Sequence, residues 1–408
     1  MNRPELQPVV RLREPRVHWP LLIGVLGLMV MGGLFIASAV LARPGADQLP
    51  FHRTGWFRQI IWYALGLGVG TVAVWKDYRV LARWATVLYG LSLLLLVAVL
   101  IPGIGSTQGW GARRWIDLGP FQFQPSELAK LTFILAMADF LSRPKPELQR
   151  PAIFWRGLAM ALVPFLLVLK EPDLGSSLVF LPVALVMMFV AGVPTRYLTR
   201  WVGAVAAVGL ILVVDVLWLP AEWQPIKLEP YQKRRLMVYF GRPVIPRDAT
   251  EQERIAALRA YRDAAYSVNQ ALISVGSGGL WGKGWRQGTQ NALGYLPRGV
   301  AHNDFIFSVI AEESGFVGSM IVLALYATVL FSGLHIAAGA RDLLGRLLAT
   351  GIVAFLFVHV FINIGMHLRL VPVTGIPLPL LSYGGTSVLV TLLAAGLLHN
   401  VYTHRRTD

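Results

Sequence analysis

Carboxylates inside or beside apolar runs are the first side chains of this 408-residue sequence that could do chemistry. An acid in a membrane-spanning run is costly unless it is paired or faces a wet cavity, so each one is a candidate for function. Glu127 and Lys130 stand three positions apart, a spacing that puts both on one face of a helix. They are either a structural ion pair or one polar wall of a substrate cavity.

Asp304 stands at the start of a later apolar run, directly after 301–303 (Ala-His-Asn). Asp is a common N-cap residue, and the same carboxylate could instead act as a general base exposed to an outer cavity. Glu171 and Asp173 flank Pro172 at a break between two apolar runs. They predict either a charged, capped turn or a contact to a metal or a sugar.

Four more polar residues lie within apolar runs. Asp215 has no sequence neighbour to pair with and is either part of a proton path or a satisfied interior carboxyl. His359, Asn363 and His367 follow one another at four-residue steps and form a polar stripe on one helix face. Because the stripe has too few ligands for a metal site, it predicts hydrogen bonds between helices.

Basic and glycine-rich segments indicate an anionic ligand. Pyrophosphate is bound by such cations and by free backbone N–H groups, although anionic lipid headgroups attract a basic loop as well. The basic residues concerned are Arg113, Arg114, Lys233, Arg234, Arg235, Lys283 and Arg286.

The elements that must position these groups are membrane helices. Of the residues in the chain, 55% are hydrophobic and 14% are charged, whereas about a quarter of the residues of a soluble domain are charged. Disorder and nucleic-acid binding need far more charge, so both are excluded. It has no Cys, which excludes disulfides and thiolate chemistry. A spanning helix needs roughly 20 apolar residues. Ten runs approach that length: 19–41, 56–75, 84–102, 126–142, 157–170, 174–193, 201–219, 304–332, 347–368 and 385–402.

The distribution of Lys and Arg predicts that both termini are cytoplasmic. With the N-terminus inside, the short inside segments carry 17 basic residues and the short outside segments carry 7, the bias expected of cytoplasmic loops. The tails 1–18 and 403–408 are then cytoplasmic, and 220–303 is a large extracytoplasmic loop between the seventh and eighth helices. Within it, 248–267 predicts a helix that the following glycines break. We therefore expect an all-α polytopic membrane protein with a single domain, 1–408.

Four ordered sequence blocks resemble the SEDS family (shape, elongation, division and sporulation) of peptidoglycan glycosyltransferases. With ten spans in the same order, the resemblance covers nearly the whole chain. The Gly-Lys-Gly-Trp and Gly-Thr-Gln variants are more similar to the elongation branch, RodA, than to the division branch, FtsW. The blocks are 114–130 (RWIDLG to FQPSELAK), 171–177 (EPDLGSS), 277–313 (SGGLWGKGW, GTQ, HNDFIF and AEE) and 375–385 (GIPLP and LSYGG).

The resemblance implies an enzyme of the bacterial cytoplasmic membrane that acts in cell-wall synthesis, cell elongation and rod shape. Its substrate is lipid II, a disaccharide-pentapeptide on undecaprenyl pyrophosphate, which it polymerises into β-1,4 glycan on the extracytoplasmic side. Its partners are a class B penicillin-binding protein (a transpeptidase), other elongation-complex proteins and membrane lipids, and its cofactor is a divalent cation, Mg²⁺ or Mn²⁺. The family's essential aspartate falls on Asp304. The substrate-binding residues that the resemblance implies are Glu127, Lys130, Arg114, Gln232, Arg235, Lys283, Thr289, Gln290, His302 and Ser382.

The implied reaction needs a base and a stabilised leaving group. The acceptor's sugar 4-hydroxyl is a poor nucleophile, and Asp304 is our hypothesis for the base that takes its proton. The charge that grows on the leaving pyrophosphate needs cations or a divalent metal. An α-linked donor and a β-linked product mean one inversion, which fits a single displacement without a covalent glycosyl-enzyme.

The chain also departs from the family pattern. It has Asn303 where the family has Thr, and its stretch 243–263 is longer and more charged. That stretch is either a docking element for the transpeptidase or a solvated helix. Two other function classes compete with the enzyme. A lipid II flippase needs access from both leaflets and no essential base, and a non-catalytic scaffold would keep wall synthesis intact after loss of the Asp304 carboxylate.

Overall fold

The computed structural model describes residues 17–42, 50–107, 113–119, 121–218, 230–241, 243, 250–296 and 301–405. In this part of the chain, eight helices are long and apolar enough to cross a membrane. They are α1 (Trp19–Leu41), α2 (Gly55–Trp75), α7 (Pro151–Lys170), the pair α8 (Leu174–Leu178) and α9 (Phe180–Ala191), α10 (Thr195–Trp218), α14 (Ile306–Ala338), α15 (Leu343–His367) and α16 (Gly385–Thr403). With the shorter α4 (Ala85–Leu100) and α5 (Pro125–Leu141), they follow the ten predicted runs in order, so the polytopic helical fold is confirmed.

Further helices and three short strands connect these helices. They are η2 (Phe51–Arg53), α3 (Tyr78–Ala82), α6 (Lys145–Leu148), α11 (Pro230–Phe240), α12 (Glu251–Ser277), α13 (Thr289–Ala292) and the strands β1 (Gly105–Ser106), β2 (Trp115–Asp117) and β3 (Gln122–Phe123). The strands form an antiparallel sheet in the order β1-β2-β3, with Ile116 paired to Gly105 on one side and to Phe123 on the other. This small sheet is an addition to the all-α fold that the sequence predicted.

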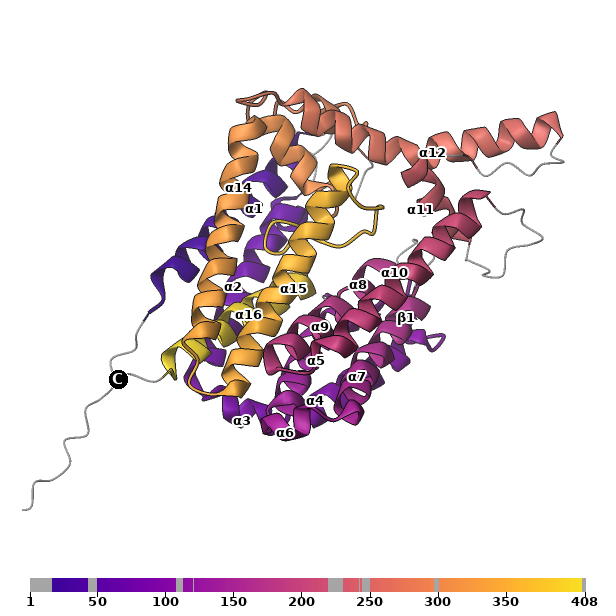
Figure 1. The fold of residues 1–408 in the computed structure, drawn as a ribbon. Helices are drawn as coiled ribbons and strands as arrows, with labels where there is room; N and C mark the ends of the chain where they lie inside the picture. The colour runs from indigo at the N-terminus through magenta and orange to yellow at the C-terminus, as the bar shows by residue number, and fades with distance from the viewer. Residues whose placement is uncertain are drawn as a thin grey trace, which may run out of the picture.

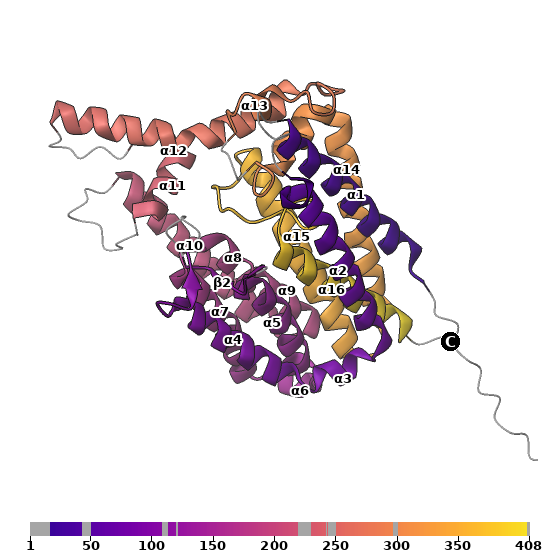
Figure 2. The same ribbon diagram turned by 180° about the vertical axis from the view of Figure 1, so that it is seen from behind.

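The helices form two groups that lie side by side (Figures 1 and 2). One holds α1, α2, α14, α15 and α16, and the other holds α4, α5, α7, α8, α9 and α10. Helix α15 joins them, because it packs on α14 and α16 in the first group and on α5 and α9 in the second. Helix α12 lies across one end of the molecule and extends beyond both groups (Figure 1).

Small residues allow the closest helix contact, between α2 and α16. A Cβ at Gly70 of α2 would lie 2.8 Å from the carbonyl oxygen of Leu392, and a Cβ at Gly396 of α16 would overlap the backbone at Gly70. Glycine lets two helix backbones approach in this way, and van der Waals packing is a main source of helix association in a membrane. The two helices of this pair are therefore closely packed within the first helix group.

Helix α12 is longer than the sequence predicted. Thr250 and Glu253 form a capping box at its N-terminus. The helix continues beyond 267 through Gly276 and Ser277, and its C-cap is Gly278. The prediction that these glycines break the helix is confirmed, since α12 ends at Ser277, and Gly278 and Gly282 have a second effect on packing. A Cβ at either position would overlap the backbone of α14 at Ala311 and Glu313, so these glycines permit close packing. The first turns of α12 are exposed, as a solvated helix would be, and docking by 243–263 stays a prediction, since 242 and 244–249 lie outside the described residues.

The segment after α12 inserts into a break in α14. Gly315 has a φ of 66° and interrupts the helical backbone. The amide of Phe316 donates to the carbonyl oxygen of Gly279 (2.9 Å), and the amide of Val317 donates to that of Leu280 (3.1 Å). The two chain segments therefore complete each other's backbone hydrogen bonds at the point where the helix alone could not.

Candidate functional site

A cavity of about 1340 Å³ lies between the two helix groups. Its wall contains parts of α2, the small sheet, α8, α11 and α12, and the segments 302–305, 369–377 and 383–387. This volume exceeds the usual 300–1,000 Å³ of small-molecule sites, and a long amphiphilic ligand would suit it. The basic residues of the wall are His52, Arg58, Arg114, Arg235, His302 and Arg369.

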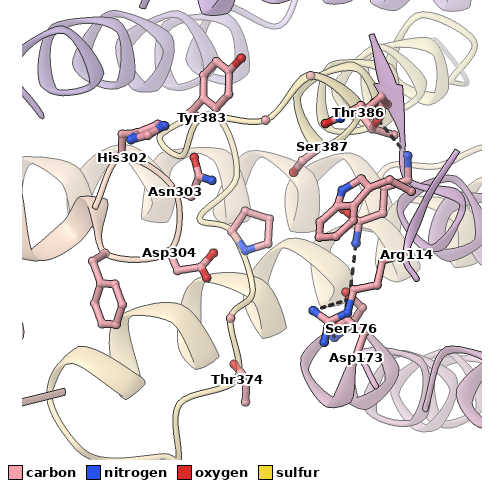
Figure 3. A pocket seen from close by; sticks show the side chains of 18 of the residues that line it. Arg114, Asp173, Ser176, His302, Asn303, Asp304, Thr374, Tyr383, Thr386 and Ser387 are labelled. Carbon is pink, nitrogen blue, oxygen red and sulfur yellow. Dashed lines mark hydrogen bonds and ion pairs between the residues drawn. The ribbon is translucent and has the colours of Figure 1, made fainter. Parts of the chain in front are cut away.

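Asp304 points into this cavity from the loop that precedes α14 (Figure 3). Its backbone is fixed by the amide of Asn363, which donates to the carbonyl oxygens of Asp304 (3.1 Å) and Ile376 (2.7 Å). The preceding residues are fixed by the segment before α16, since Ser382 Oγ donates to the carbonyl oxygen of Asn303 (2.7 Å). Two hydrogen bonds, one from α15 and one from the segment before α16, thus hold the backbone of residues 303 and 304, and the carboxylate faces the cavity.

The N-cap interpretation of Asp304 is wrong. Helix α14 begins at Ile306, its N-cap position is Phe305, and that position makes no side-chain cap hydrogen bond. Burial, and then the charge of Asp173, raises the pKa of Asp304 to about 6, against the opposing effects of Arg114 and Arg235. A carboxylate with a pKa near the working pH is well suited to accept a proton in a reaction.

Arg114 and Asp173 face Asp304 from the other side of the cavity (Figure 3). The Arg114 guanidinium donates to the carbonyl oxygens of Glu171 (3.1 Å) and Pro172, and its Nη1 lies 3.9 Å from Asp173 Oδ2. Asp173 Oδ1 accepts from the amide of Ser176 (3.0 Å) and caps α8. The predicted charged, capped turn is therefore confirmed, and a contact from Asp173 to a metal or a sugar stays a prediction.

Glu171 lies behind this wall and is fully buried. Burial, and then the charge of Asp173, raises the pKa of Glu171 to about 9, against the opposing effect of Arg114. Glu171 is therefore protonated at neutral pH, and its carboxyl does not contribute a negative charge to the cavity wall.

The predicted substrate-binding residues fall into three places. Arg114, Arg235 and His302 lie in the cavity wall with Asp304, and Arg235 Nη1 donates to the carbonyl oxygen of Thr374 in that wall (3.2 Å). Ser382 lies just behind the wall, where its Oγ also accepts from the amide of Leu378 (2.7 Å) and shapes the loop. Gln232 lies on α11, one turn from Arg235, and is not part of the wall.

Glu127 and Lys130 form a second place, outside the cavity wall. Lys130 Nζ lies 2.5 Å from Glu127 Oε1 and 3.1 Å from His359 Nε2, and both side chains of the ion pair are 1% exposed. The structural ion pair is therefore confirmed, and direct contact with a substrate stays a prediction. The stripe that begins at His359 bonds mainly to the loop 375–377, through His359 Nδ1 to the carbonyl oxygen of Pro377 (3.3 Å) and through Asn363 to that of Ile376.

Lys283, Thr289 and Gln290 form the third place, around Glu312 of α14. Glu312 Oε1 accepts from Lys283 Nζ (2.6 Å), Thr289 Oγ1 (3.0 Å) and the amide of Gln290 (3.1 Å). The Glu312 side chain is fully buried, and none of the three partners belongs to the cavity wall. In this structure they neutralise an internal carboxylate, and their predicted contact with a substrate stays a prediction.

The sequence analysis did not identify several residues of the wall as site residues. They include His52 and Arg58, from η2 and the first turn of α2, and Gln124, Ser176 and Arg369. A basic residue at the start of an apolar run is also typical of an ordinary membrane-interface anchor, so Arg58 carried no distinct signal. Asp215 is buried in α10, away from the wall, and its role stays open.

No group of three or more His, Asp or Glu side chains that could hold a metal ion occurs among the described residues. The cavity does hold two facing carboxylates, Asp173 and Asp304. Mg²⁺ usually binds through one or two carboxylates together with substrate phosphates and water. The wall therefore fits an ion that arrives with a phosphorylated ligand, and does not fit one that needs a complete protein cage.

Known proteins are similar to this chain over nearly its full length. A family model described as "Cell cycle protein" (FtsW/RodA/SpoVE) matches residues 19–407. Peptidoglycan glycosyltransferase MrdB of Escherichia coli (strain K12) is 37% identical over 388 residues, which cover 95% of this chain and 93% of that protein. A solved chain from "Structural coordination of polymerization and crosslinking by a peptidoglycan synthase complex" is 32% identical, with a TM-score of 0.74, and the match covers 96% of this chain and 98% of that one. The rod shape determining protein RodA of Thermus thermophilus is 31% identical, with a TM-score of 0.63 and the same coverage.

Proposed function

This chain belongs to the FtsW/RodA/SpoVE family, the SEDS proteins, and we propose that it is a peptidoglycan glycosyltransferase that polymerises lipid II for cell elongation and rod shape. The observation that carries the chemistry is the position of Asp304. Its carboxylate, with a pKa of about 6, faces a large cavity whose opposite wall holds Arg114. This arrangement supplies a base on one side and a cation for a leaving phosphate on the other.

Asp304 is the general base of the proposed reaction. Its carboxylate takes the proton of the acceptor's sugar 4-hydroxyl, and the hydroxyl oxygen forms a bond to the donor's anomeric carbon. The bond between that carbon and the pyrophosphate oxygen breaks, and the pyrophosphate leaves with the electron pair. Arg114 and Arg235 stabilise the charge on the leaving group. A single displacement inverts the anomeric carbon from α to β, as the product requires.

A divalent cation is part of this proposal as a companion of the substrate. Mg²⁺ or Mn²⁺ held by the pyrophosphate would be within the reach of Asp173 and Asp304, the two carboxylates that face each other across the cavity. Such an ion would offset the charge of the leaving group. Asp173 Oδ1 accepts from the amide of Ser176, and this capping hydrogen bond keeps the carboxylate oriented whether or not an ion is bound.

We further propose that the cavity faces the extracytoplasmic side of a bacterial cytoplasmic membrane and that a class B penicillin-binding protein is the partner. The bias of Lys and Arg in short loops supports this orientation. The similarity to a chain of a peptidoglycan synthase complex supports a partner that crosslinks what this chain polymerises.

The test is lipid II polymerisation in detergent by the full chain with its co-expressed transpeptidase, with Mg²⁺ or Mn²⁺. The variant Asp304→Asn removes the base, and we expect the glycan products to disappear while they persist in a complex whose transpeptidase is inactive. Glu147→Gln is the matched control, because it neutralises an exposed carboxylate on α6, outside the cavity. Products that survive Asp304→Asn would refute the base and favour the scaffold. Lipid II transfer across vesicles without polymerisation by the intact complex would favour the flippase.

A further inference from the structure

We propose that Arg58, with His52, forms a second anion-binding subsite in the cavity, which holds the pyrophosphate of the acceptor substrate. The inference rests on the proposed function, because joining two lipid-linked sugars brings two pyrophosphates to one enzyme. Only the donor's pyrophosphate leaves. The acceptor's pyrophosphate stays attached and needs a separate binding place.

Arg58 is available for a ligand. Three other arginines of the wall already donate to protein atoms, since Arg114 bonds carbonyl oxygens beside α8, Arg235 bonds that of Thr374, and Arg369 bonds the side chain of Asn269. Arg58 is exposed in the cavity wall, and across the described ranges its guanidinium makes no hydrogen bond or ion pair. A guanidinium with all its N–H groups free can bind two phosphate oxygens at once.

Arg58 belongs to the wall that carries Asp304. Its neighbour Gln59 is fully buried, donates to the carbonyl oxygen of Ser382 (3.3 Å) and accepts from the amide of Gly384 (3.3 Å). The same segment holds the residues before Asp304, because the amide of Tyr383 donates to the carbonyl oxygen of His302 (2.9 Å). The first turn of α2 and the loop 302–305, which carries Asp304, are therefore fixed to one another through residues 382–384.

This placement assigns the two cationic groups to different substrates. The base takes its proton from the acceptor, so the acceptor must lie against the wall that carries Asp304. Arg114 lies on the facing wall (Figure 3), where the donor's pyrophosphate leaves. Arg58 is tied through residues 382–384 to the loop that carries the acceptor's base, and His52 of η2, which packs on α2, adds a second nitrogen donor to the cavity wall.

The surface beside Arg58 suits the lipid end of the acceptor. Ile61 and Trp62 line the cavity three and four positions after Arg58, on the same face of α2. The ring of Trp62 packs edge-on against Phe121 (5.7 Å between centroids), and a Cβ at Gly385 would meet it at 2.5 Å. A fixed apolar surface next to a free guanidinium matches the junction between an isoprenoid chain and its pyrophosphate.

Kinetics with separate donor and acceptor test the assignment. The full complex is given a lipid-linked oligosaccharide whose terminal 4-hydroxyl is blocked, which acts only as donor, and lipid II as acceptor. We expect Arg58→Gln to raise the KM for the acceptor about tenfold or more, the effect of losing a charge-assisted hydrogen bond, while the donor's KM and kcat change less than about twofold. Arg58→Lys keeps the charge and should recover part of the affinity. Arg196→Gln is the matched control, because Arg196 is exposed at the start of α10 and lies outside the cavity wall, and the acceptor's KM should stay within about threefold.

A binding measurement separates this inference from the proposed function. Titration of farnesyl pyrophosphate onto the unreacting complex should give two sites in the unaltered protein and one in Arg58→Gln, with an unchanged melting temperature as the check on folding. If the unaltered complex polymerises lipid II but Arg58→Gln leaves the acceptor's KM and the two sites unchanged, the subsite is refuted alone. An equal rise in both KM values would also refute it, since Arg58 would then not distinguish the substrates.

Discussion

The pH dependence of polymerisation is the most direct test of Asp304, because the structure predicts its midpoint. A base must be ionised, so activity should be lost as the pH falls through its pKa. Burial raises the pKa of Asp304 from 3.8 to about 6. A group with that pKa is about nine-tenths ionised at pH 7 and about one-tenth ionised at pH 5, so kcat/KM should fall about tenfold between them. An aspartate at its ordinary pKa would lose less than about a tenth of its ionised form over that interval.

Two wall variants should move this midpoint in opposite directions. Arg114 lowers the pKa of Asp304, so Arg114→Gln should raise the midpoint of the acid limb, and Asp173 raises the pKa, so Asp173→Asn should lower it. Glu171 does not interfere, because its pKa of about 9 keeps it protonated throughout the acid limb. The rates themselves will fall in both variants, but the midpoint is read from the shape of the profile.

The assay is the initial rate of glycan formation from pH 4.5 to 8.5, with the complex checked for folding at each pH. Arg196→Gln is the control for loss of a guanidinium, because Arg196 is exposed at the start of α10 and is not part of the wall. A midpoint near 4 would mean that burial does not control this carboxylate. A shift in the same direction for Arg114→Gln and Asp173→Asn would refute the electrostatic reasoning.

Three further predictions concern stability. Glu171→Gln should stabilise the protein at pH 7 by on the order of 1–3 kcal/mol. Because the pKa of Glu171 is raised by folding, its contribution to the free energy of unfolding is complete below the unfolded pKa and is lost as the pH rises towards about 9. Thermal melts from pH 5 to 8 should therefore show a smaller decline of the melting temperature in the variant. Lys130→Met should destabilise by about 3–5 kcal/mol, since it leaves Glu127 buried and unpaired, and Lys130→Met combined with Glu127→Gln should recover most of the loss in the same melts. Gly396→Ala should lower the melting temperature because its methyl group overlaps the backbone of α2, whereas Gly68→Ala, with no atom within 4 Å of its Cβ, should not; an equal effect of both would refute the packing argument.

The helices could be predicted because their signal is local. Each apolar run ends at polar residues, and the observed boundaries of α1, α2 and α16 lie within one residue of the predicted ones. The sheet beside α4 gave no such signal, because strands of two or three residues show no alternation. The break at Gly315 in α14 was also not predicted, since the hydrogen bonds that compensate it come from Gly279 and Leu280, which are distant in sequence.

The site could be predicted only in part, because a charged side chain does not reveal which opposite charge it meets. Lys283 lies in a basic, glycine-rich loop that is typical of phosphate binding, but the fold places it against Glu312, 29 positions later. Arg114 has the same residue type as Arg58, and the sequence singled out the first alone. The two differ in their hydrogen bonds. The Arg114 guanidinium donates to carbonyl oxygens, whereas the Arg58 guanidinium donates to no atom in the described part of the chain.

Two aspartates of the cavity show how the fold separates a base from a structural carboxylate. Asp173 caps α8 by accepting from the amide of Ser176, so one of its carboxylate oxygens is already occupied by a backbone donor. Asp304 stands two residues before α14 but does not cap it, and the hydrogen bonds that fix it go to backbone carbonyl oxygens instead. Its carboxylate thus stays without a donor among the described residues, so burial can raise its pKa. A base for a hydroxyl group needs this arrangement, because a capped carboxylate would be a weaker proton acceptor.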